Sequence, residues 1–262
     1  MKISDVLLRL ENYAPIPLAE EYDNVGLMVG DADTSFKAAL LTLDVDINVA
    51  EEAKKCGANL IISHHPLIFS PLKRITSDTA EGQCLLYLIK NNIAVYSAHT
   101  NLDSAAGGLN DLLAAILGLQ DVSPLSGEDT DTGIGRVGCL PAPLTMDGLS
   151  RDIMKKFALP AVRFTGEGDD LISRVALCTG GGASLIDEAV SAFADVYITG
   201  DIKYHNAREA CERGINLIEL SHYDSEIIVT RLFKRILGDD IKTYISEANK
   251  NVFSTLVNNG NL

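Results

Sequence analysis

The chain has 262 residues, of which 47% are apolar, and a formal net charge of −14 at pH 7. This length and apolar content allow one large or two small domains with buried cores, and they exclude a globally disordered chain. The acidic charge repels nucleic-acid phosphates and no cluster of Lys and Arg residues offsets it, so we do not expect a nucleic-acid partner.

The N-terminal stretch carries Asp5, Arg9 and Glu11 among apolar residues, which is typical of an amphipathic helix rather than a signal peptide. No apolar run approaches the roughly 20 residues that a membrane span needs. The five cysteines are scattered and never form a CxxC pair, which favours free thiols in a reducing compartment. We therefore expect a cytoplasmic protein with no membrane partner.

Strands and helices alternate along the chain. Apolar and helical patterns in the first part predict strands at residues 37–44, 58–65 and 93–103 and helices at 47–57 and 81–92. The same order returns later, with strands at 173–182, 195–201 and 215–226 and helices at 184–193 and 205–214. The segment between these parts is rich in Pro and Gly and contains the polar run SGEDTDTG, so we expect loops there and one helix at 143–159. The chain is expected to end with a helix at 226–237, a strand at 241–246 and a tail.

An internal repeat is indicated by the last strand of each part, because their alignment places His99 on His222 and Asp103 on Glu226. We therefore predict an α/β fold with two pseudo-repeated α/β halves, mostly parallel sheets and a dinuclear metal site between the halves. The first half takes residues 1–125, and the linker with the second half takes residues 126–262.

Four of the five histidines lie where a predicted strand ends, and open α/β sheets place their ligands at such ends. His64 and His65 end one strand, and Pro66 bars a helical conformation at His65. Both imidazoles can then face the same site, where each binds one of two metal ions. The alternative is a solvated pair of loop histidines, and the pair alone does not decide between these interpretations.

Two further histidines are each followed by a carboxylate four residues later: His99 by Asp103, and His222 by Glu226. Four residues make about one helical turn, so both side chains of a pair can share a helix face. A helix-capping role would explain Asp103 or Asp224 singly, but it would not explain the matching pairs. We therefore predict two divalent metal ions, with zinc, iron or manganese favoured by mixed imidazole and carboxylate ligands. The predicted ligands are His64, His65, Asp103, His222 and Glu226.

His99 is the candidate catalytic residue. It is a further ligand, a partner that orients Asp103, or a proton carrier, and we favour the orienting role because five ligands suffice for two ions. Asp201 is either a site residue or a cap of the helix that carries His205.

The glycines of TGGGAS (residues 179–184) stand between a predicted strand and a predicted helix. They either let backbone amides approach an anion or form a tight turn capped by Ser184, and we favour the turn. The pattern is neither GxGxxG nor a phosphate loop, so it is weak evidence for a nucleotide.

These motifs resemble the NIF-three-like family, whose bacterial members carry the label GTP cyclohydrolase 1 type 2, and the resemblance covers nearly the whole chain. It rests on segments in matching order and spacing: EYDNVGLMVG, ISHHPLIF, AHTNLDSAAGGLND, TGGGAS, TGDIKYHNA and SHYDSE. Tyr22 stands where the family frequently has tryptophan, Ser221 where it usually has glycine, and Asp224 where it usually has a small residue. None of these departures removes a ligand.

The resemblance implies a dinuclear centre held by the same five residues, and a toroidal homohexamer whose metal sites open toward a central cavity. Our leading hypothesis is a metal-dependent hydrolase of a small-molecule substrate. The family label implies ring opening of a guanine nucleotide, and a phosphoester or pyrophosphate hydrolase would use the same ions. The non-enzymatic alternative is a metal-binding scaffold or chaperone, which would close its coordination sphere where an enzyme keeps an open metal position.

Overall fold

The computed structural model describes residues 1–127 and 131–257, which form two compact units. Unit 1 contains residues 1–108 and 227–250, and unit 2 contains residues 109–226 and the segment that begins at Asn251. This division differs from the expected one at residue 125, because the chain returns to the first unit after residue 226. The returning segment supplies a helix and the edge strand of the first sheet.

Unit 1 is built on a five-stranded sheet with the order β1-β4-β3-β2-β11. The four strands from β4 to β11 are parallel, and β1 is antiparallel to β4. The strands are β1 (Gly26–Val29), β2 (Ala39–Thr42), β3 (Leu60–Ser63), β4 (Ala94–Ser97) and β11 (Thr243–Ile245). Every residue of β2, β3 and β4 is buried, as expected for parallel strands that are covered on both faces.

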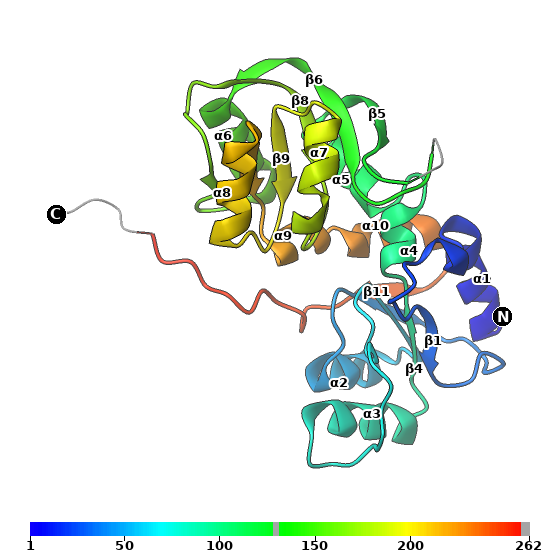
Figure 1. Cartoon of the computed structure of the whole chain (residues 1–262). Helices are drawn as coiled ribbons and strands as arrows, with labels where there is room; N and C mark the ends of the chain where they lie inside the picture. The colour runs from blue at the N-terminus through cyan, green and yellow to red at the C-terminus, as the bar shows by residue number, and fades with distance from the viewer. Residues whose placement is uncertain (128–130, 258–262) are drawn as a thin grey trace. The chain divides into compact units, whose positions relative to one another are not determined.

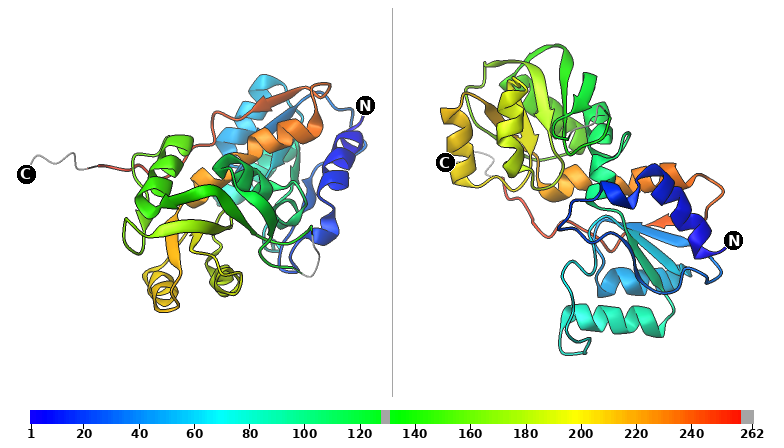
Figure 2. Two further views of the ribbon diagram at one scale, coloured as in Figure 1. Left: turned by 90° about the horizontal axis from the view of Figure 1, so that it is seen from above. Right: turned by 45° about the vertical axis from the view of Figure 1, so that its right-hand side comes forward.

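Helices cover both faces of this sheet. Figure 2 shows α2 (Ile47–Cys56) and α3 (Ala80–Lys90) on one face, and α1 (Ile3–Tyr13) and α10 (Val229–Leu237) on the other. Apolar side chains of α2 and α3 form one core cluster with Leu40, Ile61 and Val95 of the sheet. The 3₁₀ helix η1 (Ile16–Leu18) and the short helix α4 (Thr100–Ser104) complete the unit.

Unit 2 is built on a six-stranded sheet with the order β5-β6-β8-β9-β10-β7, in which only β8, β9 and β10 are parallel (Figure 1). The strands are β5 (Gln120–Pro124), β6 (Arg136–Thr145), β7 (Arg163–Phe164), β8 (Leu171–Leu177), β9 (Val196–Thr199) and β10 (Asn216–Glu219). The helices are α5 (Leu109–Leu117), α6 (Met146–Phe157), α7 (Ile186–Ser191), α8 (Tyr204–Glu212) and α9 (His222–Glu226), with the 3₁₀ helix η2 (Ala183–Leu185). Figure 2 shows α5 and α6 on one face and α7 and α8 on the other.

The expectation of mostly parallel sheets is correct for unit 1 and wrong for unit 2. Three of the five pairings in the second sheet are antiparallel, because the segment expected as loops contributes β5, β6 and β7. Pro141 and Pro143 prevented the prediction of β6 from the sequence, because proline lacks the amide hydrogen that a regular ladder of strand hydrogen bonds needs. The strand accommodates them at a register shift between Cys139 and Leu144. The polar run SGEDTDTG and the tail lie partly outside the described residues.

The remaining predicted elements form close to their expected places, with helices that begin at side-chain caps. Asp46 accepts the Val49 amide before α2, and Thr145 accepts the Gly148 amide before α6. All five cysteines lie among the described residues and none of them is in a disulfide, as the spacing predicted. Within residues 1–127 and 131–257, no helix is both long enough and apolar enough to cross a membrane.

Candidate metal-binding site

The first cluster of candidate ligands lies at the carboxyl edge of the sheet in unit 1. His64 and His65 follow directly after β3, and His99 stands between β4 and α4. Because β3 and β4 are parallel neighbours, paired at Ser63 and Ser97, their ends lie side by side. One nitrogen from each of the three imidazoles lies within 4.8 Å of the others, a spacing that a metal ion can bridge.

Each of these imidazoles is held by an acceptor at its Nδ1 atom. His64 Nδ1 lies 2.8 Å from the Ala98 carbonyl, His65 Nδ1 lies 2.7 Å from Asp44, and His99 Nδ1 lies 2.9 Å from Asp23. Since a carbonyl or carboxylate can only accept, each Nδ1 carries the proton and donates it. The Nε2 lone pair of each ring is then the one able to coordinate a metal ion, as in the histidines of known metal sites.

Asp103 lies on α4, is buried, and brings its Oδ1 atom 3.6 Å from His64 Nε2. The expected helical turn between His99 and Asp103 is present in the backbone, where the Asp103 amide donates to the His99 carbonyl at 3.1 Å. The His99 ring instead binds Asp23, which the sequence motifs did not single out as a site residue.

The Asp23 side chain is fully buried. Burial by itself would raise its pKa, but hydrogen bonds from His99 and from the hydroxyl and amide of Thr100 outweigh burial and lower the pKa. Asp23 is therefore a carboxylate over the ordinary pH range, and a carboxylate holds the His99 ring in the tautomer that exposes Nε2.

The second cluster lies in unit 2, at the corresponding edge of its parallel strands. His222 and Glu226 form the first and last residues of α9, directly after β10, and His222 Nε2 lies 3.0 Å from Glu226 Oε2. His222 Nδ1 lies 2.7 Å from Asp201, which follows β9. The hydrogen bond to Glu226 raises the His222 pKa to about 9 against the opposing effect of burial, and Asp201 raises it further. Asp201 is thus a partner of His222, while His205 is exposed on α8 beside the Tyr204 ring.

The glycine-rich turn of TGGGAS packs against α9. Gly180 has a φ of +65°, and a Cβ at this position would overlap Glu226 Oε1 and approach His222 Nε2 to 3.2 Å. The Gly180 amide donates to Ser225 Oγ at 3.0 Å. The turn is therefore needed to leave room for the His222 and Glu226 side chains, and Ser184 lies inside η2 rather than at a helix cap.

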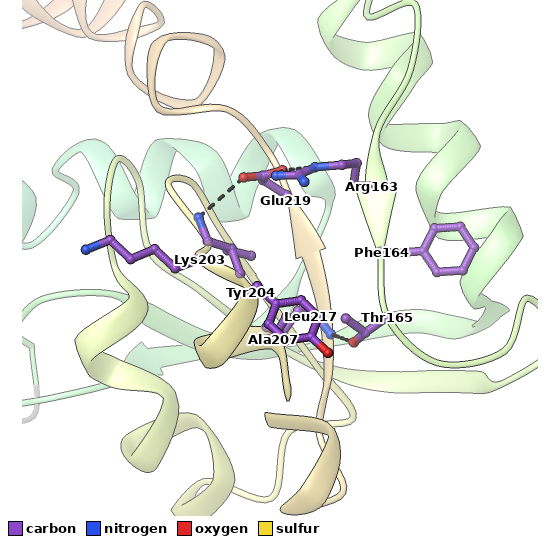
Figure 3. A pocket seen from close by; sticks show the side chains of 9 residues that line it. Arg163, Phe164, Thr165, Lys203, Tyr204, Ala207, Leu217 and Glu219 are labelled. Carbon is purple, nitrogen blue, oxygen red and sulfur yellow. Dashed lines mark hydrogen bonds and ion pairs between the residues drawn. The ribbon is translucent and has the colours of Figure 1, made fainter. Parts of the chain in front are cut away.

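Two concave surfaces lie near the second cluster. A cavity of about 660 Å³ is lined by Asp201, Ser221 and Asp224 together with residues of the C-terminal segment, and it therefore includes the hydrogen-bond partner of His222, Asp201. A smaller cavity of about 240 Å³ adjoins α8 (Figure 3). There Arg163 lies alongside Glu219, and the Lys203 and Phe164 side chains extend to opposite sides. The residues that line this cavity include none of the candidate ligands.

The donor atoms suit a transition metal. Imidazole nitrogens and carboxylate oxygens without thiolates are typical of zinc, iron and manganese sites. An acceptor at the Nδ1 atom of four histidines, His64, His65, His99 and His222, is the arrangement that orients metal-ligating histidines. The residues present therefore fit a bound divalent metal ion.

The chain is similar to a well-defined group of proteins. The family described as Duf34/NIF3 (NGG1p interacting factor 3) matches residues 1–256. A Clostridium perfringens protein named GTP cyclohydrolase 1 type 2 homolog is 39% identical, over 97% of this chain and 99% of the relative. A Methanocaldococcus jannaschii protein of the same name is 35% identical, over 92% of this chain and 96% of the relative.

Solved structures agree with this similarity. The structure of Staphylococcus aureus hypothetical protein SA1388 has a TM-score of 0.90 at 30% identity, covering 98% of this chain and 99% of that protein. Reduced HcgD from Methanocaldococcus jannaschii has a TM-score of 0.82 at 33% identity, covering 94% of this chain and 98% of that protein. The mixed α/β fold with two sheets matches these structures, and the chain belongs to the DUF34/NIF3 family.

Proposed function

We propose that this protein binds two divalent metal ions and uses them to hydrolyse a small-molecule substrate. The proposed ligands are His64, His65, Asp103, His222 and Glu226, with the two clusters acting together as one dinuclear centre. The observation that carries this proposal is the acceptor at Nδ1 of each of the three ligand histidines, which makes Nε2 the nitrogen at which a metal ion would bind in place of a proton.

The similar placement of the two clusters supports the proposal. Both units contain three adjacent parallel strands, β2-β3-β4 and β8-β9-β10, and both place a histidine and a carboxylate beyond the last of these strands. This is the arrangement expected if the two halves descend from a repeat that contributes ligands from each copy.

A dinuclear centre of this kind, when loaded, supplies a water of near-neutral pKa and polarises the bond under attack. The protein's own residues provide the surroundings. Glu226 and Asp103 are buried carboxylates that offer negative charge to a cation. The cavity of about 660 Å³ that Asp201 lines has the size of a small-molecule site.

The names of the relatives point to a guanine nucleotide as the first substrate to test. The experiment uses chelated protein that is reloaded with zinc, iron or manganese and assayed against guanine nucleotides, phosphodiesters and pyrophosphates. Release of formate from a guanine nucleotide by the loaded protein alone would support ring opening, and phosphate release would support the phosphoester alternative. A loaded protein that turns over none of these compounds faster than the metal-free protein would favour a metal-binding scaffold.

The dinuclear arrangement has its own test. Two manganese ions about 3.5–4 Å apart, the usual spacing in two-metal sites, give an exchange-coupled electron paramagnetic resonance spectrum. A spectrum of two uncoupled manganese ions would show that the two clusters bind metal as separate sites. His205→Ala, which changes the exposed histidine on α8, is the matched control because it should retain the wild-type spectrum.

A further inference from the structure

The cavity of about 660 Å³ in unit 2 combines a polar wall with an apolar one. Its polar wall lies at the carboxyl edge of the parallel strands, where Asp201 follows β9 and Glu219, Ser221 and Asp224 lie at and beyond the end of β10. Its apolar wall includes the segment 157–162, in which every residue is apolar. Ligands of α/β proteins bind at this edge of a sheet, and the volume suits a small molecule.

The charges in this cavity are predominantly negative. Its lining contains the carboxylates of Asp201, Glu219 and Asp224 and the guanidinium of Arg163, which gives a formal excess of two negative charges. Arg163 pairs with Glu219 (Figure 3), and Asp201 accepts from His222 Nδ1. Within residues 1–127 and 131–257, no basic side chain pairs with Asp224. A cavity of this charge attracts cations and repels anions.

Asp224 and Ser221 contact each other, and both depart from the NIF-three-like pattern, which usually has a small residue and a glycine at these positions. Ser221 Oγ accepts the Asp224 amide at 3.1 Å, and its hydroxyl donates to Asp224 Oδ2. The first bond is a helix cap at the start of α9 and needs no carboxylate at position 224. Asp224 also belongs to neither group of described side chains that lie close enough to share a metal ion. Its carboxylate is therefore required neither by the cap nor by the candidate metal site.

We propose that Asp224 makes this cavity selective for an organic cation, namely an amidine or guanidine joined to an apolar body. A carboxylate accepts the paired N–H groups of such a cation, and the segment 157–162 offers an apolar surface for the rest of the molecule. The phosphate groups of a nucleotide would face the excess of negative charge and are disfavoured in this cavity. This inference rests on the proposed function in taking the cavity as the substrate site, and it names the class of substrate. Binding of the cation itself requires no metal.

The test compares benzamidine, benzamide and benzoate, which have similar shapes and carry a positive, a zero and a negative charge. Isothermal titration calorimetry measures their binding to the chelated full chain at one fixed ionic strength, so that benzoate has no metal ion to coordinate. Benzamidine should bind most tightly and benzoate least tightly. Asp224→Asn should weaken benzamidine binding about 10-fold, as expected for the loss of a charge-assisted hydrogen bond, and should leave benzamide binding unchanged.

Glu212→Gln is the matched control, because it removes one negative charge from an exposed side chain on α8 that does not line the cavity. It should bind benzamidine as the wild type does. Equal losses in Asp224→Asn and Glu212→Gln would show that benzamidine responds only to the net charge of the chain, and would overturn the proposal. Asparagine keeps an oxygen that accepts the Ser221 hydroxyl, and Asp224→Ala, which should lose benzamidine binding to the same extent, provides a second variant.

The outcomes separate this inference from the proposed function. A wild-type chain that binds benzamidine no more tightly than benzamide would overturn the cation site, whatever the metal-loaded protein hydrolyses. A chain that shows the expected order of binding and its dependence on Asp224, but hydrolyses nothing when loaded with metal, would retain the cation site and defeat the proposed hydrolysis.

Discussion

Glu226 occupies the space that a side chain at position 180 would need. A Cβ on Gly180 would overlap Glu226 Oε1 and come within 3.0 Å of its Cδ, and the backbone φ of +65° at this residue disfavours any residue except glycine. Gly180→Ala should therefore displace Glu226, destabilise unit 2 by roughly 1–3 kcal/mol and lower metal content. Thermal unfolding and metal analysis on the same sample measure both effects.

Gly181→Ala is the matched control for this variant. A Cβ at position 181 would meet Asp201 Oδ2 at 3.4 Å, an ordinary contact, and no positive φ has to be maintained. We expect wild-type metal content and stability. Equal losses in the two variants would mean that the turn matters as a whole and that the contact between Gly180 and Glu226 has no special role.

Asp44 and Asp201 should tune metal affinity without holding the fold together. Each accepts the Nδ1 proton of a proposed ligand, His65 or His222, and each side chain is more than half exposed. Asp44→Asn and Asp201→Asn should each weaken metal binding about 10- to 100-fold in competition with a chelator. Asp33→Asn removes an exposed carboxylate that pairs with Lys2 and should have no effect. Unchanged affinity in both test variants would contradict the orienting role.

The metal-free protein should lose stability as the pH rises toward 9. The His222 pKa is raised to about 9, mainly by Glu226, so the folded protein holds a proton that the unfolded chain releases near 6.5. The stabilisation is complete below pH 6.5 and disappears as the pH rises through 9. Thermal unfolding of chelated protein between pH 6 and pH 10 measures this loss. The loss of stability should be smaller in Glu226→Gln. An identical pH profile in that variant would refute the assignment of the raised His222 pKa to Glu226.

We propose that the protein assembles as a homohexamer, as the family resemblance implies. Val252, Phe253 and Leu256 on the C-terminal segment are each more than 80% exposed, which is unusual for side chains of this type unless a partner covers them. Light scattering at micromolar concentration should give a mass about six times the 28.1 kDa of one chain. A stable monomer would exclude the hexamer, and removal of the residues after Lys250 tests whether this segment contributes.

The sequence predicted the parallel elements and the strand-end histidines well, because both follow from local patterns. The predicted strands at 58–65 and 93–103 became β3 and β4, and their buried apolar runs left His64, His65 and His99 at one edge. Strand ends are brought together by sheet order, so polar residues that follow neighbouring parallel strands can be expected to meet. Asp44, at the end of β2, carried the same signal and could have been found by this rule.

Other features depend on contacts that no local pattern contains. Asp23 precedes β1, and it reaches His99, 76 residues further along the chain, only because β1 pairs antiparallel with β4. Strand β6 was concealed by its prolines, and β11 could not be assigned to the first sheet from its sequence, since any apolar strand of that length fits a parallel edge. Tertiary pairing decided these three cases.

The return of the chain to unit 1 has a consequence for biosynthesis. Strand β11 pairs with β2 from Thr243 onward, and α10 packs against the same sheet, yet both are translated after every described strand of unit 2. The first 108 residues therefore leave the ribosome with β2 as an open sheet edge, a surface prone to pairing with other chains. Unit 2 has its whole sheet in one continuous stretch and can close first. A chain that ends after the sheet of unit 2 but before residue 243 would retain that sheet and would leave β2 as a permanently exposed edge of the N-terminal sheet.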